Sequence, residues 1–167
     1  MVGLANKYPI ILLSCVTLLT ACEDNVSEAD QTSKTNTGIV HDDNRAAIAP
    51  ALLQRGRELY LKNCTVCHGI NAEGSPDWRH RDADGKFPPP PLNGTGHAWH
   101  HPQRALMDTI KNGTQRLGGN MPPWKDRLSD AEIELIILWF QTQWPDQLYE
   151  AWQRMDREAQ QRQEEKR

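Results

Sequence analysis

The stretch Cys64-Thr65-Val66-Cys67-His68 places two thiols and an imidazole within five consecutive residues. This C-x-x-C-H spacing is typical of covalent attachment of a c-type haem. Each cysteine can add across a vinyl group of the haem to form a thioether, and the histidine then lies under the iron as an axial ligand. The histidine is what favours haem, because a bare C-x-x-C is also found in redox dithiols and as half of a zinc site.

Length and composition limit what the rest of the chain can be. The 167 residues allow one domain plus tails. Only 38% of the residues are hydrophobic, which suits a small domain built around a cofactor. The net charge of −3 gives no indication of nucleic-acid binding.

Residues 1–21 are predicted to be a lipoprotein signal peptide. Lys7 precedes an apolar run, Ile10–Leu19, that is too short to span a bilayer and suits a secretion signal. The run ends in Leu19-Thr20-Ala21-Cys22, which resembles the bacterial lipobox, in which cleavage precedes a cysteine that carries lipid. We expect Cys22 to be lipidated; the alternative is an ordinary signal followed by an incidental cysteine. Several acyl chains anchor a protein stably, whereas one holds it weakly.

The remaining cysteines support the haem interpretation. Cys15 would be lost with the signal and Cys22 would carry lipid, which leaves Cys64 and Cys67. A four-cysteine zinc site is thereby excluded, and no disulfide can form unless these two pair with each other.

The lipidated cysteine and a flexible linker are expected to occupy residues 22–49. This segment is rich in Asp, Glu, Ser, Thr and Asn and shows no apolar period, so it cannot bury enough surface to fold. As a random coil, the linker would span roughly 25–30 Å. It would act as a tether between the lipid and the domain that follows.

The first helix is predicted to begin at Pro50, a favourable residue for a first helical turn, and to run to about Cys64–Cys67. Leu53, Gly56 and Tyr60 share one face of this helix. A glycine costs about 1 kcal/mol in a helix interior. A close approach by a second helix would explain Gly56.

Two further helices are predicted. One runs from Pro102 or Gln103 to about Asn112, with Met107 on its apolar face. The other starts with a capping box, Ser129 and Glu132, and ends at Trp144-Pro145. Its apolar stripe comprises Ile133, Ile136, Ile137 and Phe140.

Residues 69–101 are predicted to be a loop, because glycines and the run Pro88–Pro91 interrupt any helix. A proline carbonyl here can accept the second ring N–H of His68 and fix its tautomer. His97, His100 and His101 follow. We expect a polar loop near the haem edge; binding of copper or zinc, or a second haem ligand, are the alternatives.

Met121 lies between Gly118-Gly119 and Pro122-Pro123, so we expect it at the tip of a rigid, non-helical loop. A methionine sulfur is a recognised axial ligand of haem iron. The alternative is a buried methionine that fills a gap in the core. Ligation is favoured because no helical period places Met121 in the core.

Residues 50–145 resemble a bacterial class I monohaem cytochrome c. The resemblance rests on the helix with Gly56 and Tyr60, on C-T-V-C-H at 64–68, on P-P-L-N-G at 90–94, on G-N-M-P at 119–122 and on the capped last helix. It implies an all-α fold with three to four core helices around one covalently bound haem, and crossed N- and C-terminal helices.

The resemblance also implies the site. Cys64 and Cys67 would hold haem c, and His68 and Met121 would be the axial iron ligands. The Pro90 carbonyl would accept the hydrogen bond from His68, with Pro91 as the neighbouring option.

Two segments fall outside this pattern. The first is an insert at residues 73–87 that contains Trp78, His80 and Lys86. The second is the charged tail, residues 146–167, which we expect to be a solvated, frayed helix. Its first turns could dock through Leu148, Tyr149, Trp152 and Met155. Trp99 and Trp124 are candidate partners for the haem propionates.

The sequence therefore predicts a one-electron carrier in a periplasmic respiratory chain rather than an enzyme. It would be held by lipid at the periplasmic side of a bacterial membrane, inner or outer, between a redox protein donor and an acceptor. No small-molecule substrate is expected. The alternatives are a fixed haem c subunit of a larger oxidase or dehydrogenase, a haem sensor, or a metal-handling protein.

Overall fold

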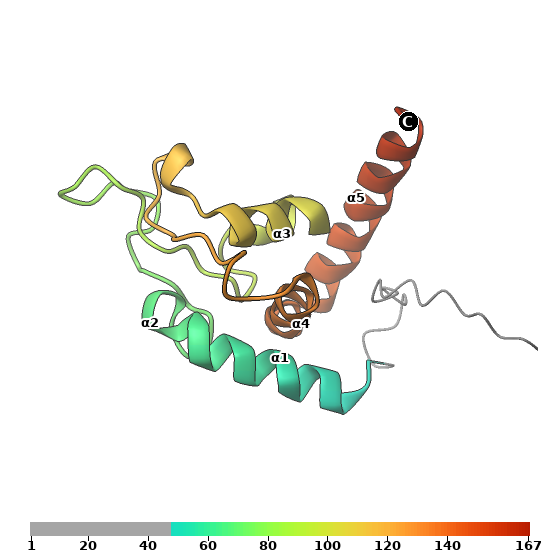
Figure 1. Cartoon of the computed structure of the whole chain (residues 1–167), viewed down its shortest axis with the longest axis horizontal. Helices are drawn as coiled ribbons and strands as arrows, with labels where there is room; N and C mark the ends of the chain where they lie inside the picture. The colour runs from blue at the N-terminus through green and yellow to red at the C-terminus, as the bar shows by residue number, and fades with distance from the viewer. Residues whose placement is uncertain (1–47) are drawn as a thin grey trace, which may run out of the picture. The chain divides into compact units, whose positions relative to one another are not determined.

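The structure, a computed structural model, describes residues 48–167, and in this range all regular elements are helices (Figure 1). The predicted signal, Cys22 and all but the last two residues of the predicted linker lie outside the described residues. The main helices are α1 (Pro50–Asn63), α3 (Gln103–Asn112), α4 (Asp130–Gln141) and α5 (Asp146–Glu164). Short helices are α2 (Thr65–His68), η2 (Ala98–His100) and η3 (Gln115–Leu117). The prediction of an all-α fold is confirmed.

The starts of the main helices coincide with residues that favour a helix start. α1 begins at Pro50 and α3 follows Pro102, as predicted. Both hydrogen bonds of the capping box between Ser129 and Glu132 are present at the start of α4. These hydrogen bonds favour the ionised carboxylate and lower the pKa of Glu132. α4 ends at Gln141, earlier than expected, and Pro145 instead precedes α5.

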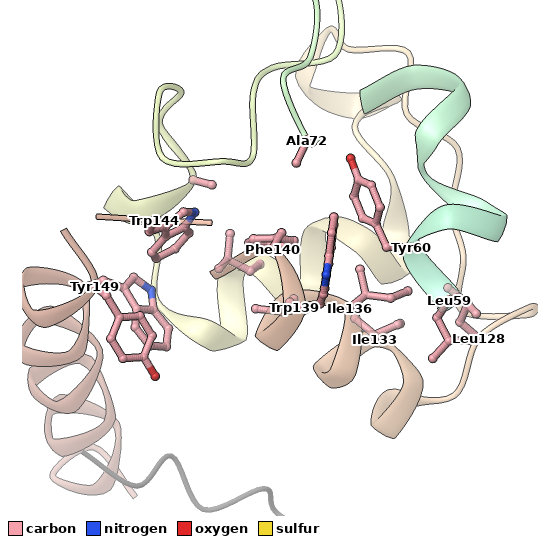
Figure 2. Close-up of a cluster of buried hydrophobic side chains, with 14 residues drawn as sticks. Leu59, Tyr60, Ala72, Leu128, Ile133, Ile136, Trp139, Phe140, Trp144 and Tyr149 are labelled. Carbon is pink, nitrogen blue, oxygen red and sulfur yellow. The ribbon is translucent and has the colours of Figure 1, made fainter. Parts of the chain in front are cut away.

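The core forms where α4 packs against α1 and α3 (Figure 1). Figure 2 shows Tyr60 of α1 beside Trp139 of α4, and their ring centroids are 4.3 Å apart. Ile133, Ile136 and Phe140 are buried from the same helix. The predicted apolar stripe is thus the inner face of α4, and the N- and C-terminal core helices pack together.

Gly56 marks the closest approach of α1 and α4. A Cβ at this position would collide with the backbone carbonyl of Leu135 and lie 3.1 Å from the Cβ of Trp139. The neighbour is backbone, so it cannot move aside as a flexible side chain would. The expected close helix approach at Gly56 is confirmed.

We predict that Gly56→Ala lowers the free energy of unfolding. Helix propensity alone would raise it by about 1 kcal/mol. Overpacking against the Leu135 carbonyl should cost about 1–3 kcal/mol and outweigh that gain. Denaturant unfolding measures the difference, and Arg57→Ala, an exposed change on the same helix, is the control. A more stable Gly56→Ala protein would contradict the close contact.

The C-terminal tail is a docked helix. Tyr149, Trp152, Asp156 and Ala159 of α5 are all buried, so the packed face continues well beyond the first turns. An Asp156 carboxylate oxygen accepts the backbone N–H of Gln103 at 2.7 Å, and so caps the first turn of α3. The buried Tyr149 and Trp152 agree with the predicted docking of the first turns, whereas the expectation of a solvated, frayed helix is wrong for the rest of this face. Within residues 48–167, no helix is both long enough and apolar enough to cross a bilayer.

Candidate functional site

A cavity of about 680 Å³ lies among α2, α3, α4 and the connecting segments 69–97 and 113–129. It brings together Cys64, Cys67, His68 and Met121, four residues that the sequence singles out. Most of the other lining residues are apolar or proline, among them Leu92, Leu106, Ile110, Pro122, Trp124 and Phe140.

His68 ends the short helix α2, and its orientation is fixed by one hydrogen bond. Its Nδ1 lies 2.9 Å from the carbonyl oxygen of Pro90. A carbonyl can only accept, so Nδ1 carries the hydrogen and Nε2 is the nitrogen left for a metal. Burial lowers the pKa of His68, and the Pro90 contact partly opposes that shift. A neutral ring is the form that binds a metal.

The Pro90 carbonyl is held in place by the segment that follows His68. The N–H of Ser75 donates to the Pro89 carbonyl, and the N–H of Leu92 donates to the Ala72 carbonyl, both at 2.8 Å. Gly74, at φ +63°, lies against the backbone of Pro90, where a Cβ would collide. These contacts hold the Pro90 segment against the chain that follows His68.

Tyr60 supports the chain directly after His68. Its hydroxyl donates to the carbonyl of Gly69 at 2.8 Å, and burial raises its pKa. Cys64 is half-buried and burial raises its pKa to about 12, whereas Cys67 is exposed. Within the described residues, neither cysteine takes part in a disulfide. They are thus available for thioether formation.

Met121 lines the same cavity from the non-helical loop that its flanking residues predict. Thr114 holds Met121 in this loop through two hydrogen bonds. The Thr114 hydroxyl accepts the N–H of Met121 at 3.1 Å, and the Thr114 N–H donates to the Met121 carbonyl at 3.0 Å. Sequence analysis missed Thr114, because only the fold pairs it with a residue seven positions later.

The three histidines are divided by the fold. His97 and His101 line the cavity, whereas His100 stacks on Trp99 with ring centroids 3.6 Å apart. In residues 48–167, no group of three or more His, Cys, Asp or Glu side chains is arranged to hold a metal ion. This arrangement gives no support to a metal-handling role.

The two tryptophans proposed near the haem propionates also differ. Trp124 lines the cavity, but Trp99 packs against the core and donates to the Gly96 carbonyl at 3.2 Å. Trp78 and Arg79 of the 73–87 insert do line the cavity. The sequence marks Trp78 as part of the insert, but it predicts no role at the site for either residue.

The residues present suit a covalently held haem. The cavity is mainly apolar, and its size suits a large flat cofactor. Two cysteine sulfurs line it, and one imidazole nitrogen and one thioether are available to a metal. Histidine and methionine are the axial pair found in c-type electron carriers.

Comparisons with known proteins point in the same direction. A family model described as cytochrome c oxidase, cbb3-type, subunit III matches residues 51–140. A cbb3-type cytochrome c oxidase subunit CcoP of Azospirillum brasilense is 30% identical over 116 residues, which are 70% of this chain and 36% of the relative. Cytochrome c-551 of Bacillus subtilis is 27% identical over 136 residues, 80% of this chain and 94% of the relative.

The match to oxidase subunits is partial in length. A FixP subunit of Azorhizobium caulinodans is 31% identical over 90 residues, 53% of this chain and 26% of the relative. The chain spans about a third of the length of the CcoP relatives it matches. No solved structure matches the chain.

Proposed function

The chain belongs to the c-type cytochrome family of cbb3-type cytochrome c oxidase subunit III, whose members carry covalently bound haem c with iron, and from this premise we propose a one-electron carrier. In this proposal Cys64 and Cys67 hold the haem. His68 and Met121 would supply the imidazole nitrogen and the thioether sulfur that bind its iron, and Pro90 would orient His68.

One observation carries the proposal: a single cavity gathers Cys64, Cys67, His68 and Met121 from two segments more than 50 residues apart. When bound, haem iron supplies reversible exchange of one electron between the ferric and ferrous states. The chain's own residues would occupy both axial positions and surround the group with apolar side chains. A methionine ligand and burial both favour a raised reduction potential.

An iron with two protein ligands has no position for a substrate, so we propose that the protein is not an enzyme. Its partners would be a redox protein donor and a redox protein acceptor. Transient electron-transfer contacts of this kind are small. Cys67 and Val66 are exposed, so the segment to which the haem would be attached faces solvent.

We further propose that lipid on Cys22 and the linker after it hold this domain at the periplasmic side of a bacterial membrane. The basis is the lipobox-like stretch 19–22 and the polar composition of residues 23–49. The stretch leaves open whether the membrane is the inner or the outer one. Mass spectrometry of the mature N-terminus tests the lipid.

A fixed subunit of a larger oxidase is the second candidate. It is favoured by the CcoP and FixP relatives, which are named as subunits of cbb3-type oxidases. Affinity purification from membranes in mild detergent separates the two candidates. A stoichiometric membrane complex supports the subunit, and a freely isolated monomer supports the carrier.

Absorption spectra of the mature protein in both oxidation states, with a potential titration, test the carrier. We expect covalent low-spin haem c that shows the Met–iron signature when oxidised and does not bind CO when reduced at neutral pH. Both results follow from filled axial positions. A ferrous protein that binds CO readily would contradict the carrier and favour a haem sensor or small enzyme.

A further inference from the structure

One corner of the cavity is built from positively charged or protonatable side chains. Arg79, His97 and His101 all line the cavity there, together with Trp78. The guanidinium carbon of Arg79 lies 4.6 Å from the Trp78 ring centroid. His97 stacks on Trp78 with centroids 5.1 Å apart, and His101 meets His97 edge-on at 5.4 Å. We call these four residues the Trp78 cluster.

The Trp78 cluster has no acidic partner within the cavity, since neither Asp nor Glu is among the lining residues. His97 is an exposed residue, but partial burial of its ring lowers its pKa, and His101, His100 and Arg79 lower it further. Each of these neighbours is itself a cation or can become one. The cluster therefore brings together groups that repel one another when charged, an arrangement that favours binding of an anion.

Haem carries two propionate carboxylates, on the edge of the macrocycle opposite to its vinyl groups. The vinyl groups are the ones that cysteines bond, so the propionates point away from the C-x-x-C-H motif. Resting on the proposed function, we propose that Arg79, with His97 and His101, binds the haem propionates in this protein. A guanidinium can donate two parallel N–H bonds to one carboxylate, and stacking on an indole holds it flat for that purpose.

This assignment gives a role to two segments that lie outside the pattern of the family resemblance. Trp78 and Arg79 belong to the 73–87 insert. The backbone of His101 is held by α5, because Trp152 Nε1 donates to the His101 carbonyl at 2.9 Å. The insert would thus supply a residue that binds the propionates, and the C-terminal helix would support another.

The test uses the mature holoprotein with Arg79→Gln. The propionate pKa is measured from the pH dependence of the NMR shifts of the propionate methylene groups, and the reduction potential is measured alongside. We expect the propionate pKa to rise, because a nearby cation favours the ionised carboxylate. The equilibrium constant for reduction should fall about three- to fivefold, since removing a positive charge favours the ferric state.

Two variants serve as controls. Arg79→Lys keeps the charge and should restore both values toward those of the unchanged protein. Arg127→Gln should move neither, because the Arg127 guanidinium also lies over a cavity-lining indole, Trp124, at 5.7 Å but does not itself line the cavity.

The proposal would be overturned if Arg79→Gln, like the control Arg127→Gln, changed neither the propionate pKa nor the reduction potential. The Trp78 cluster would then be a packing contact only. Absence of covalent haem from the unchanged protein would overturn the proposed function as well. The two failures are therefore distinguishable.

Discussion

Replacing Met121 with alanine is expected to abolish the Met–iron absorption signature and to lower the reduction potential while the haem remains covalently attached. The loss follows from removing the thioether that the loop presents to the cavity. Axial ligands set haem potentials over roughly 0.8 V, so the change should be an appreciable fraction of that range. Spectra and a potential titration of the purified variant measure both effects.

Met107→Ala is the matched control, because Met107 packs against the core and does not line the cavity. It should lower stability and leave the Met–iron signature in place. A Met121→Ala protein with an unchanged spectrum would mean that a histidine is the sixth ligand. His97 and His101 would then be the candidates, since both line the cavity.

Features fixed by neighbouring residues could be predicted from the sequence. The C-x-x-C-H motif and the capping box of α4 could be recognised because each lies within five or four consecutive residues. The start of α1 at Pro50 depends on one residue. Gly56 indicated a close helix contact. A glycine inside a helix weakens the helix, and its presence is explained where a neighbouring element needs the space that a side chain would fill. The Pro90 contact came from the resemblance and has the expected partners in the structure.

Features that depend on distant parts of the chain could not be predicted. Thr114 and Arg79 have no periodicity that marks them, and their positions at the cavity become evident only from the folded chain. Beyond its first turns, the tail was expected to be solvated because charged residues dominate its composition. Its buried residues recur along one face of α5, and the partners of that face lie about 50 residues earlier.

Replacing Trp152 with alanine is expected to reduce the free energy of unfolding by about 3–5 kcal/mol, the usual cost of removing a buried indole. Trp152 is 1% exposed and packs against Trp144 and Tyr149, with ring centroids 5.9 and 5.7 Å away. The change also leaves the His101 carbonyl without its indole donor. Domains of this size have a total stability of about 5–15 kcal/mol, so the loss should be plain in urea unfolding of the mature protein.

Two further variants separate docking of α5 from the hydrogen bond. Trp152→Phe keeps most of the apolar volume and should cost about 1–3 kcal/mol, chiefly for loss of the partly buried hydrogen bond to the His101 carbonyl. Arg154→Ala, on the exposed face of α5, should change stability by no more than about 0.5 kcal/mol. If Trp152→Ala were no more costly than Arg154→Ala, α5 would not be docked in solution. The hydrogen bond from Trp152 would then not support His101, one of the three residues proposed to bind the propionates.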